Sequence, residues 1–220
     1  MKLPNEFEYY VKQGIIRKII VDRQRAEFLM KESETSLEGL KERVKIIGIN
    51  DKNANSIIKD CYDIIMEMVR AKLLLAGYFS SGSYAHEGEI SYLKKLRFPN
   101  IDISFLNELR YFRNGITYYG KILDKEYAQK TLDFLERFKE KLKPFLVIIR
   151  GPLGVGKSTI AKMLAKELDG EYFSIDSILE QEGLDKIDEK EGCIPLSNFI
   201  KANQKILPKI KNTIETNKIA

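Results

Sequence analysis

The sequence predicts an α + α/β fold, in which an all-helical bundle is followed by a truncated α/β domain. Three observations lead to this prediction. Apolar residues recur at helical spacing through residues 1–144. The apolar run at 145–150 is typical of a buried strand, and a glycine-rich loop that opens a helix follows it directly. The boundary is expected at Lys143-Pro144, so that residues 1–144 and 145–220 form separate domains with their own cores.

Periodic apolar positions define the expected helices of the first domain. They cover residues 7–30, 36–47, 57–75, 87–96, 103–119 and 125–142. The strongest pattern is an apolar stripe of about five turns, made of Ile57, Ile58, Cys61, Ile64, Ile65, Met68, Val69 and Leu75. Helices of this kind joined by short loops are expected to pack as an antiparallel bundle.

The glycine-rich segment at 151–159 has the spacing of a P-loop, or Walker A motif. Glycines let successive backbone N–H groups point at phosphate oxygens, and the helix expected at 157–168 adds the positive end of its dipole. Lys157 would neutralise the β- and γ-phosphates, and the Ser158 hydroxyl would ligate Mg²⁺. The predicted cofactors are therefore ATP or GTP with Mg²⁺, and the alternative is a chance glycine-rich turn. The candidate nucleotide contacts are Gly151, Pro152, Leu153, Gly154, Val155, Gly156, Lys157, Ser158 and Thr159.

The segment after the loop helix carries a second candidate strand at 171–175, followed by Asp176, and a long helix at 196–217. Together with the P-loop, this order resembles the start of small P-loop kinases of the shikimate kinase, gluconate kinase and zeta-toxin type, over residues 145–220. In those families an Asp after the second strand contacts the acceptor or serves as a base, which the resemblance implies for Asp176. The alternative is that Asp176 caps a short helix at 177–181.

The resemblance to small P-loop kinases also implies that this chain lacks parts of the kinase fold. These kinases have a third strand with a metal-binding acidic residue, and a lid with arginines, whereas this chain ends at 218–220, where the third strand should begin. Phosphoryl transfer depends on positioning and electrostatics, so we expect nucleotide to be bound better than it is turned over. A truncated gene product, half of a split protein, and a scaffold completed by a partner chain are all compatible with this pattern.

The first domain carries residues that resemble the HEPN helical domain of prokaryotes, over residues 5–142. The segments that carry the resemblance are 59–63, 71–78, 83–86 and 109–120. HEPN ribonucleases dimerise and cleave RNA without metal, using an Arg and a His that are separated by four to six residues. Here Arg113-Asn114 stands at the matching place, but no His follows, and the residue reached after four intervening positions is Tyr118. Tyr titrates near pH 10, so this departure argues against RNA cleavage.

Two interpretations therefore remain for Arg113, Asn114 and Tyr118. They form an RNA or dimer site, or they pack and make ion pairs within the bundle. His86, the one histidine in the sequence, is expected in the loop before the fourth helix. A lone histidine is more often a packing or capping residue than a catalyst.

Composition limits the protein's environment and partners. The formal net charge of +5 resides in residues 1–144, which allows a polyanionic partner. Cys61 and Cys193 match no metal or disulfide spacing, and no signal peptide or membrane-spanning run is evident, so a cytoplasmic location is expected.

Three functions follow from these patterns. The first is a nucleotide-binding protein with a kinase-like P-loop, incomplete as a phosphotransferase on its own. The second is a non-catalytic interaction or dimerisation module with a degenerate P-loop, and the third is a HEPN ribonuclease or toxin. Whether the chain is an enzyme is left open. The intact P-loop favours the first function, and the missing His disfavours the third.

Overall fold

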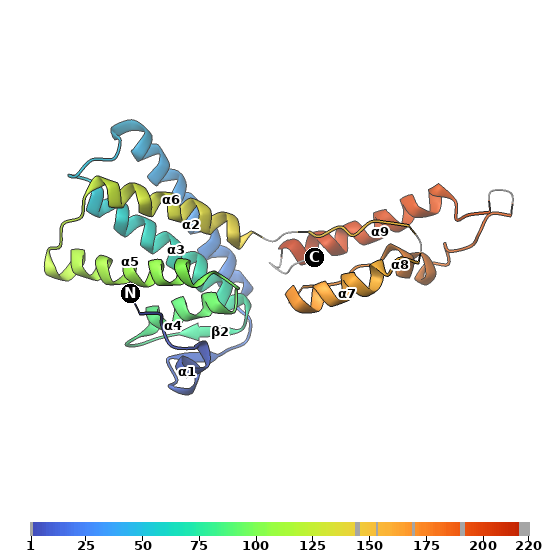
Figure 1. Ribbon diagram of the computed structural model, residues 1–220, viewed down its shortest axis with the longest axis horizontal. Helices are drawn as coiled ribbons and strands as arrows, with labels where there is room; N and C mark the ends of the chain where they lie inside the picture. The colour runs from blue at the N-terminus through green and yellow to red at the C-terminus, as the bar shows by residue number, and fades with distance from the viewer. Residues whose placement is uncertain (1, 144–145, 153, 169, 190–191, 216–220) are drawn as a thin grey trace. The chain divides into compact units, whose positions relative to one another are not determined.

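The computed structural model describes residues 2–143, 146–152, 154–168, 170–189 and 192–215. It divides into two compact units, Met1–Lys141 and Leu142–Ala220. The first unit contains α1 (Phe7–Lys12), β1 (Ile16–Lys18), α2 (Arg23–Ile47), α3 (Ala54–Leu75), β2 (Tyr78–Ser80), α4 (Ala85–Ser91), the 3-10 helix η1 (Tyr92–Lys94), α5 (Asn100–Tyr119) and α6 (Lys125–Leu142). The second contains α7 (Lys157–Leu168), α8 (Ile175–Gln181) and α9 (Leu196–Glu215) (Figure 1).

Helix α3 forms the centre of the first unit. It buries the apolar stripe expected from the sequence except Leu75, which is half-buried, and it also buries Tyr62, Met66 and Leu73, so it is covered on more than one face. The loop before it is fixed locally, because the Asn53 side chain donates a hydrogen bond of 2.8 Å to the Gly48 carbonyl. This short loop returns the chain, so that α2 packs along α3 (Figure 1).

Aromatic side chains and one asparagine hold α5 and α6 in the bundle. The Phe105 ring lies 4.7 Å from the Phe134 ring, which joins the two helices. Asn55, near the start of α3, donates to the Lys121 carbonyl at 2.9 Å and accepts from the Leu123 N–H at 3.0 Å. The connection between α5 and α6 is thereby tied to α3 by a side chain that satisfies both a donor and an acceptor of the backbone.

The prediction of one helix over residues 7–30 is wrong. Helix α1 ends at Lys12, and the chain then forms β1, which pairs antiparallel with β2 in the register Ile16 to Ser80. Gly14 ends the helix with a φ of +70°, a conformation that other residues adopt at a cost. Ile16 is 1% exposed and Ile20 is 93% exposed, so the apolar residues of this segment do not share one helix face.

The α/β prediction for residues 145–220 is also wrong. Within the described residues of this unit no strand is assigned, and the one described sheet is the pair of β1 and β2 in the first unit. Residues 146–150 and 171–174 run without helical or strand assignment. A strand exists only when a neighbouring strand pairs with its backbone, and these two segments line a cavity between them instead of pairing. The expected strand began at residue 145, which lies outside the described residues.

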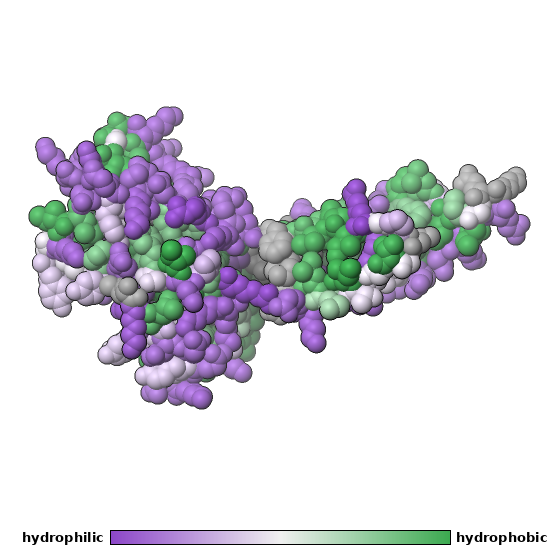
Figure 2. All heavy atoms as spheres, viewed as in Figure 1, coloured by the Kyte–Doolittle hydropathy of each residue, from purple (hydrophilic) through white to green (hydrophobic). Residues whose placement is uncertain are grey.

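Because no strands pair in the described part of the second unit, apolar side chains of this unit lie at the surface. Leu146, Val147 and Ile148 are 43%, 40% and 61% exposed, where the sequence predicted a buried strand. Figure 2 shows hydrophobic surface gathered on this unit. Its described core lies between α8 and α9 and is formed by Ile178, Leu179, Ala202 and Ile206.

The expected helices of this unit are confirmed at 157–168 and, as far as residue 215, in α9. Residues 216–217 of the predicted last helix, and the chain end at 218–220, lie outside the described residues. No helix in the described parts of the chain is both long and apolar enough to cross a lipid bilayer.

Candidate phosphate-binding site

The candidate site is the turn that leads into α7. Gly154 and Gly156 have φ values of +77° and +81°, which place them in the left-handed region where a side chain is strained. These two glycines let the chain turn sharply just before the helix begins at Lys157. Within α7, the first backbone bond to the loop runs from the Ile160 N–H to the Gly156 carbonyl at 3.1 Å. The N–H groups that precede Ile160 have no acceptor within the helix, as at every helix start, and an anion could accept from them.

Lys157 lies across this turn rather than extending into solvent. Its ammonium group donates a hydrogen bond of 2.6 Å to the Pro152 carbonyl, five residues earlier. The bond places a positive charge inside the curve of the loop, next to the helix N-terminus. A phosphate oxygen could replace that carbonyl as the acceptor without a large movement of the side chain.

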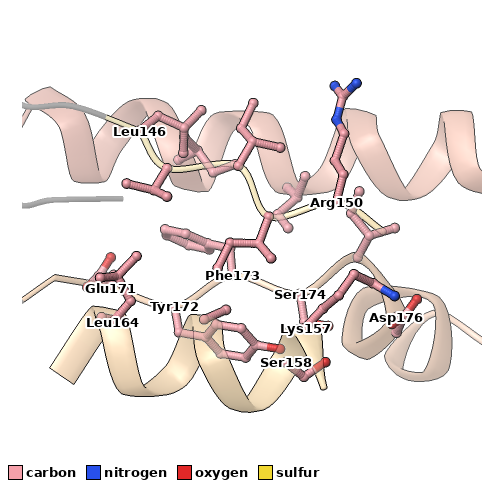
Figure 3. Close-up of a pocket in the computed structure, with 18 of the residues that line it drawn as sticks. Leu146, Arg150, Lys157, Ser158, Leu164, Glu171, Tyr172, Phe173, Ser174 and Asp176 are labelled. Atoms are coloured by element: carbon pink, nitrogen blue, oxygen red, sulfur yellow. The ribbon is translucent and has the colours of Figure 1, made fainter. Parts of the chain in front are cut away.

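A cavity of about 550 Å³ lies beside the turn within the second unit. The polar side chains at one end of this cavity are those of Lys157, Ser158 and Asp176. Figure 3 shows these side chains close to the start of α7. The rest of the wall is mostly apolar and comes from 146–149, α7, 171–173 and α9. One cavity therefore combines a lysine, a hydroxyl and a carboxylate at one end with an apolar trough.

Asp176 does not cap the short helix, so the alternative role for this residue is wrong. Helix α8 begins at Ile175, and the Ser174 side chain is its cap, accepting from the Ser177 N–H at 3.3 Å. Asp176 lies in the first turn, where a carboxylate interacts favourably with the helix dipole. Its side chain is exposed and lines the same cavity as the neighbouring Lys157 and Ser158, although α7 and residues 170–174 separate it from them in sequence.

The other predicted loop contacts have no further interactions that mark them as binding residues. Val155 is 55% exposed, and Ser158 and Thr159 are exposed at the start of α7. Leu153 lies outside the described residues. The arrangement as a whole can bind an anion through the helix start and Lys157, with the Ser158 hydroxyl available to a cation bound to that anion.

The candidate residues of the first unit are distributed over α5. Arg113 approaches Asp63 of α3 at 3.5 Å, with its Nε atom buried and without a hydrogen-bond partner in the structure described. Asn114 is half-buried, whereas Tyr118 is 69% exposed near the helix end. The structure thus directs Arg113 toward α3 and leaves Tyr118 on the surface.

The expectation that His86 lies in a loop is wrong, because it belongs to the first turn of α4. Its ring nitrogens lie 2.7 Å from the Tyr62 hydroxyl and 3.2 Å from an Arg70 nitrogen. The Arg70 Nε also donates to Glu89 at 3.0 Å. Sequence reasoning missed this network, although the spacings of Tyr62 to Arg70 and of His86 to Glu89 place each pair on one helix face.

Two curated proteins match short stretches of the chain. It is 47% identical over 47 residues to tRNA dimethylallyltransferase 9 of Arabidopsis thaliana, which covers 21% of this chain and 10% of that protein. It is 50% identical over 42 residues to shikimate kinase of Actinobacillus succinogenes, which covers 19% of this chain and 22% of that protein. No family model matches the chain, and no solved structure matches it.

The chain therefore has weak, local similarity to P-loop kinase-type enzymes. The matches span less than a quarter of either relative. Neither relative is described as a HEPN protein, so the resemblance of residues 5–142 to that family stays a prediction.

Proposed function

We propose that the second unit binds a nucleoside triphosphate with Mg²⁺ at the start of α7. The observation that carries this proposal is the position of Lys157, whose ammonium group is held inside the loop by the Pro152 carbonyl at 2.6 Å. The local similarity to kinase-type enzymes supports the same chemistry.

Each group of the site has a separate role in this proposal. The N–H groups at the start of α7 would bind phosphate oxygens, and Lys157 would neutralise their charge. The Ser158 hydroxyl would be a ligand of Mg²⁺, which would neutralise further phosphate charge. Asp176 lines the same cavity and would orient an acceptor hydroxyl if transfer takes place. The chain offers no described pattern that reads the base, so ATP and GTP are both candidates.

Three further interactions are proposed with less support than nucleotide binding. A partner chain that covers the apolar trough, a homodimer of the helical unit, and RNA binding through Arg113, Asn114 and Tyr118 are not tested by the comparisons. We also propose that a helical domain at 1–144 is followed by a nucleotide-binding domain at 145–220.

The test is calorimetric titration of the full chain with ATP and with GTP, each with and without Mg²⁺. The Lys157→Ala variant should bind about 10- to 100-fold more weakly, the loss expected for one hydrogen bond to a charged group. Lys166→Ala is the matched control, because Lys166 is an exposed lysine of the last turn of α7 and should not affect binding. Ser158→Ala should weaken binding in the presence of Mg²⁺ and leave Mg²⁺-free binding unchanged.

Two outcomes contradict the proposal. The first is a wild-type chain that binds neither nucleotide, and the second is a Lys157→Ala variant that binds as tightly as the Lys166→Ala control.

A further inference from the structure

His86 joins α4 to α3 in the first unit. It is half-buried in the first turn of α4, and its ring stacks on Tyr62 of α3, with centroids 5.9 Å apart and an interplanar angle of 14°. Both ring nitrogens have partners: Nδ1 lies 2.7 Å from the Tyr62 hydroxyl, and Nε2 lies 3.2 Å from an Arg70 guanidinium nitrogen. The position of the ring proton follows from these two contacts.

The contact with Arg70 fixes the tautomer of His86. A guanidinium group has donors and no acceptor, so Nε2 must carry a lone pair and accept from Arg70. The single proton of the neutral ring is then on Nδ1 and is donated to the Tyr62 oxygen. A second proton would have to sit on Nε2, where it would face a guanidinium donor and bring two positive charges together.

Arg70 cannot leave this position without affecting a buried carboxylate. Its Nε donates at 3.0 Å to Glu89 of α4, whose side chain is only 3% exposed. The same Glu89 oxygen accepts from the Ser80 hydroxyl of β2, and its other oxygen is buried with no hydrogen-bond partner in the structure described. Displacing Arg70 would therefore remove the countercharge of a buried carboxylate, which is costly.

The charges around His86 come from three helices. Burial is the largest cause that lowers the pKa of His86 from 6.5. The carboxylates of Glu89 (α4) and Asp63 (α3) raise this pKa, whereas the guanidinium groups of Arg70 (α3) and Arg113 (α5) lower it. Tyr62 stays neutral, because burial raises the pKa of its hydroxyl. His86 is thus surrounded by charges of both signs, and the group that faces the unprotonated Nε2 is the Arg70 cation.

We propose that His86, Arg70 and Glu89 form a proton-operated latch that holds α4 and β2 against α3 while His86 is neutral. Protonation of Nε2 breaks the contact with Arg70 and pushes the guanidinium away from the ring. Glu89 then loses the geometry that joins it to both Arg70 and Ser80, and the segment from β2 to α4 opens more readily. The latch does not depend on the P-loop or on a bound nucleotide.

The direction of the pH dependence follows from linkage. The pKa of His86 is lower in the folded chain than its ordinary value of 6.5, so the unfolded or opened state binds the proton more readily. The stabilisation is complete above pH 6.5 and is lost as the pH falls from there toward the folded pKa. Glu67 also lies on α3, and burial and the nearby Glu32 raise its pKa, so variants are needed to assign the response to His86.

The first measurement is NMR titration of the full chain, which contains a single histidine. Nitrogen shifts of the ring should show the Nδ1–H tautomer, and the pKa should lie below 6.5. Arg70→Met should raise the pKa of His86, because it removes the facing cation, and Glu89→Gln should lower it. A wild-type pKa at or above 6.5, or an Nε2–H tautomer, would overturn the proposal even if a variant fails to fold.

The second measurement is hydrogen exchange of residues 78–91 at pH 7.5 and 5.5, corrected for the intrinsic exchange rate. Protection should fall at pH 5.5 in the wild type and stay constant in His86→Gln, whose amide oxygen can still accept from Arg70 but does not titrate near neutrality. If His86→Gln loses protection at pH 5.5 to the same extent as the wild type, another group causes the response and the latch is refuted.

Discussion

Lys72 is a buried lysine near the end of α3, and replacing it should stabilise the first unit. It is 8% exposed, and burial lowers its pKa from 10.5 to about 8. At pH 7 the folded chain must hold this group charged in a place that favours the neutral form. A difference of about 2.5 pKa units corresponds to about 3 kcal/mol. Lys72→Met, which keeps the length and most of the apolar stem, should therefore raise the free energy of unfolding by up to that amount.

The sign of the pH dependence is specific. Since the folded pKa is lower than the unfolded one, wild-type stability rises as the pH increases from about 8 toward 10.5. The advantage of Lys72→Met should shrink over the same range. Urea unfolding, followed by circular dichroism at pH 7 and pH 10, measures both effects, with Lys45→Met as the control because Lys45 is exposed on α2. A Lys72→Met variant that is less stable than wild type at pH 7 would show that the ammonium group is stabilised within the fold, and the reasoning would be refuted.

Two further predictions concern cysteines and an arginine. Cys61 is buried, and burial also raises the pKa of its thiol, whereas Cys193 is exposed, so a thiol reagent should modify one cysteine in the native chain and two after denaturation. Modification of both in the native chain would indicate that α3 opens on the time scale of the reaction. Arg113→Ala should lower stability by no more than about 1 kcal/mol, because its ion pair with Asp63 is 3.5 Å long and partly exposed. A large loss of ribonuclease activity in this variant would instead support the HEPN interpretation.

Helices α3, α5 and α6 could be predicted because their apolar spacing is a local property, whereas α2 continues through residues 31–35, where a break was expected. The stripe from Ile57 to Leu75 predicted α3 within about three residues, and the residues of that stripe are in the core except Leu75, which is half-buried. The pairing of β1 with β2 could not be predicted in this way, because it joins Ile16 to Ser80, which are 64 residues apart. A three-residue strand has too few positions to distinguish alternation from helical spacing.

The candidate loop at 151–158 and the network around His86 also differ in whether their residues are close together in sequence. The candidate loop at 151–158 could be recognised in the sequence because its glycines, lysine and serine are close together along the chain. The network around His86 joins residues of α3, β2 and α4, and its chemistry depends on which nitrogen faces Arg70. The sequence spacing of Tyr62 and Arg70 is compatible with one face of α3, but it could not show that His86 would lie against both.

Because the described residues of the second unit form no sheet, the proposed nucleotide binding can be tested separately from phosphoryl transfer. Residues 146–149 are all apolar, and this composition predicts burial, yet burial in a strand requires a neighbour that the described residues do not supply. The candidate loop does not need a neighbouring strand, because the turn at Gly154 and Gly156, the start of α7 and the bond from Lys157 to the Pro152 carbonyl are all local. Transfer needs an acceptor and further charges held at fixed positions around the phosphate. Binding in calorimetry without nucleotide turnover is therefore the expected combination, and measurable turnover by the same chain would mean that the residues around the cavity already hold both substrates in line.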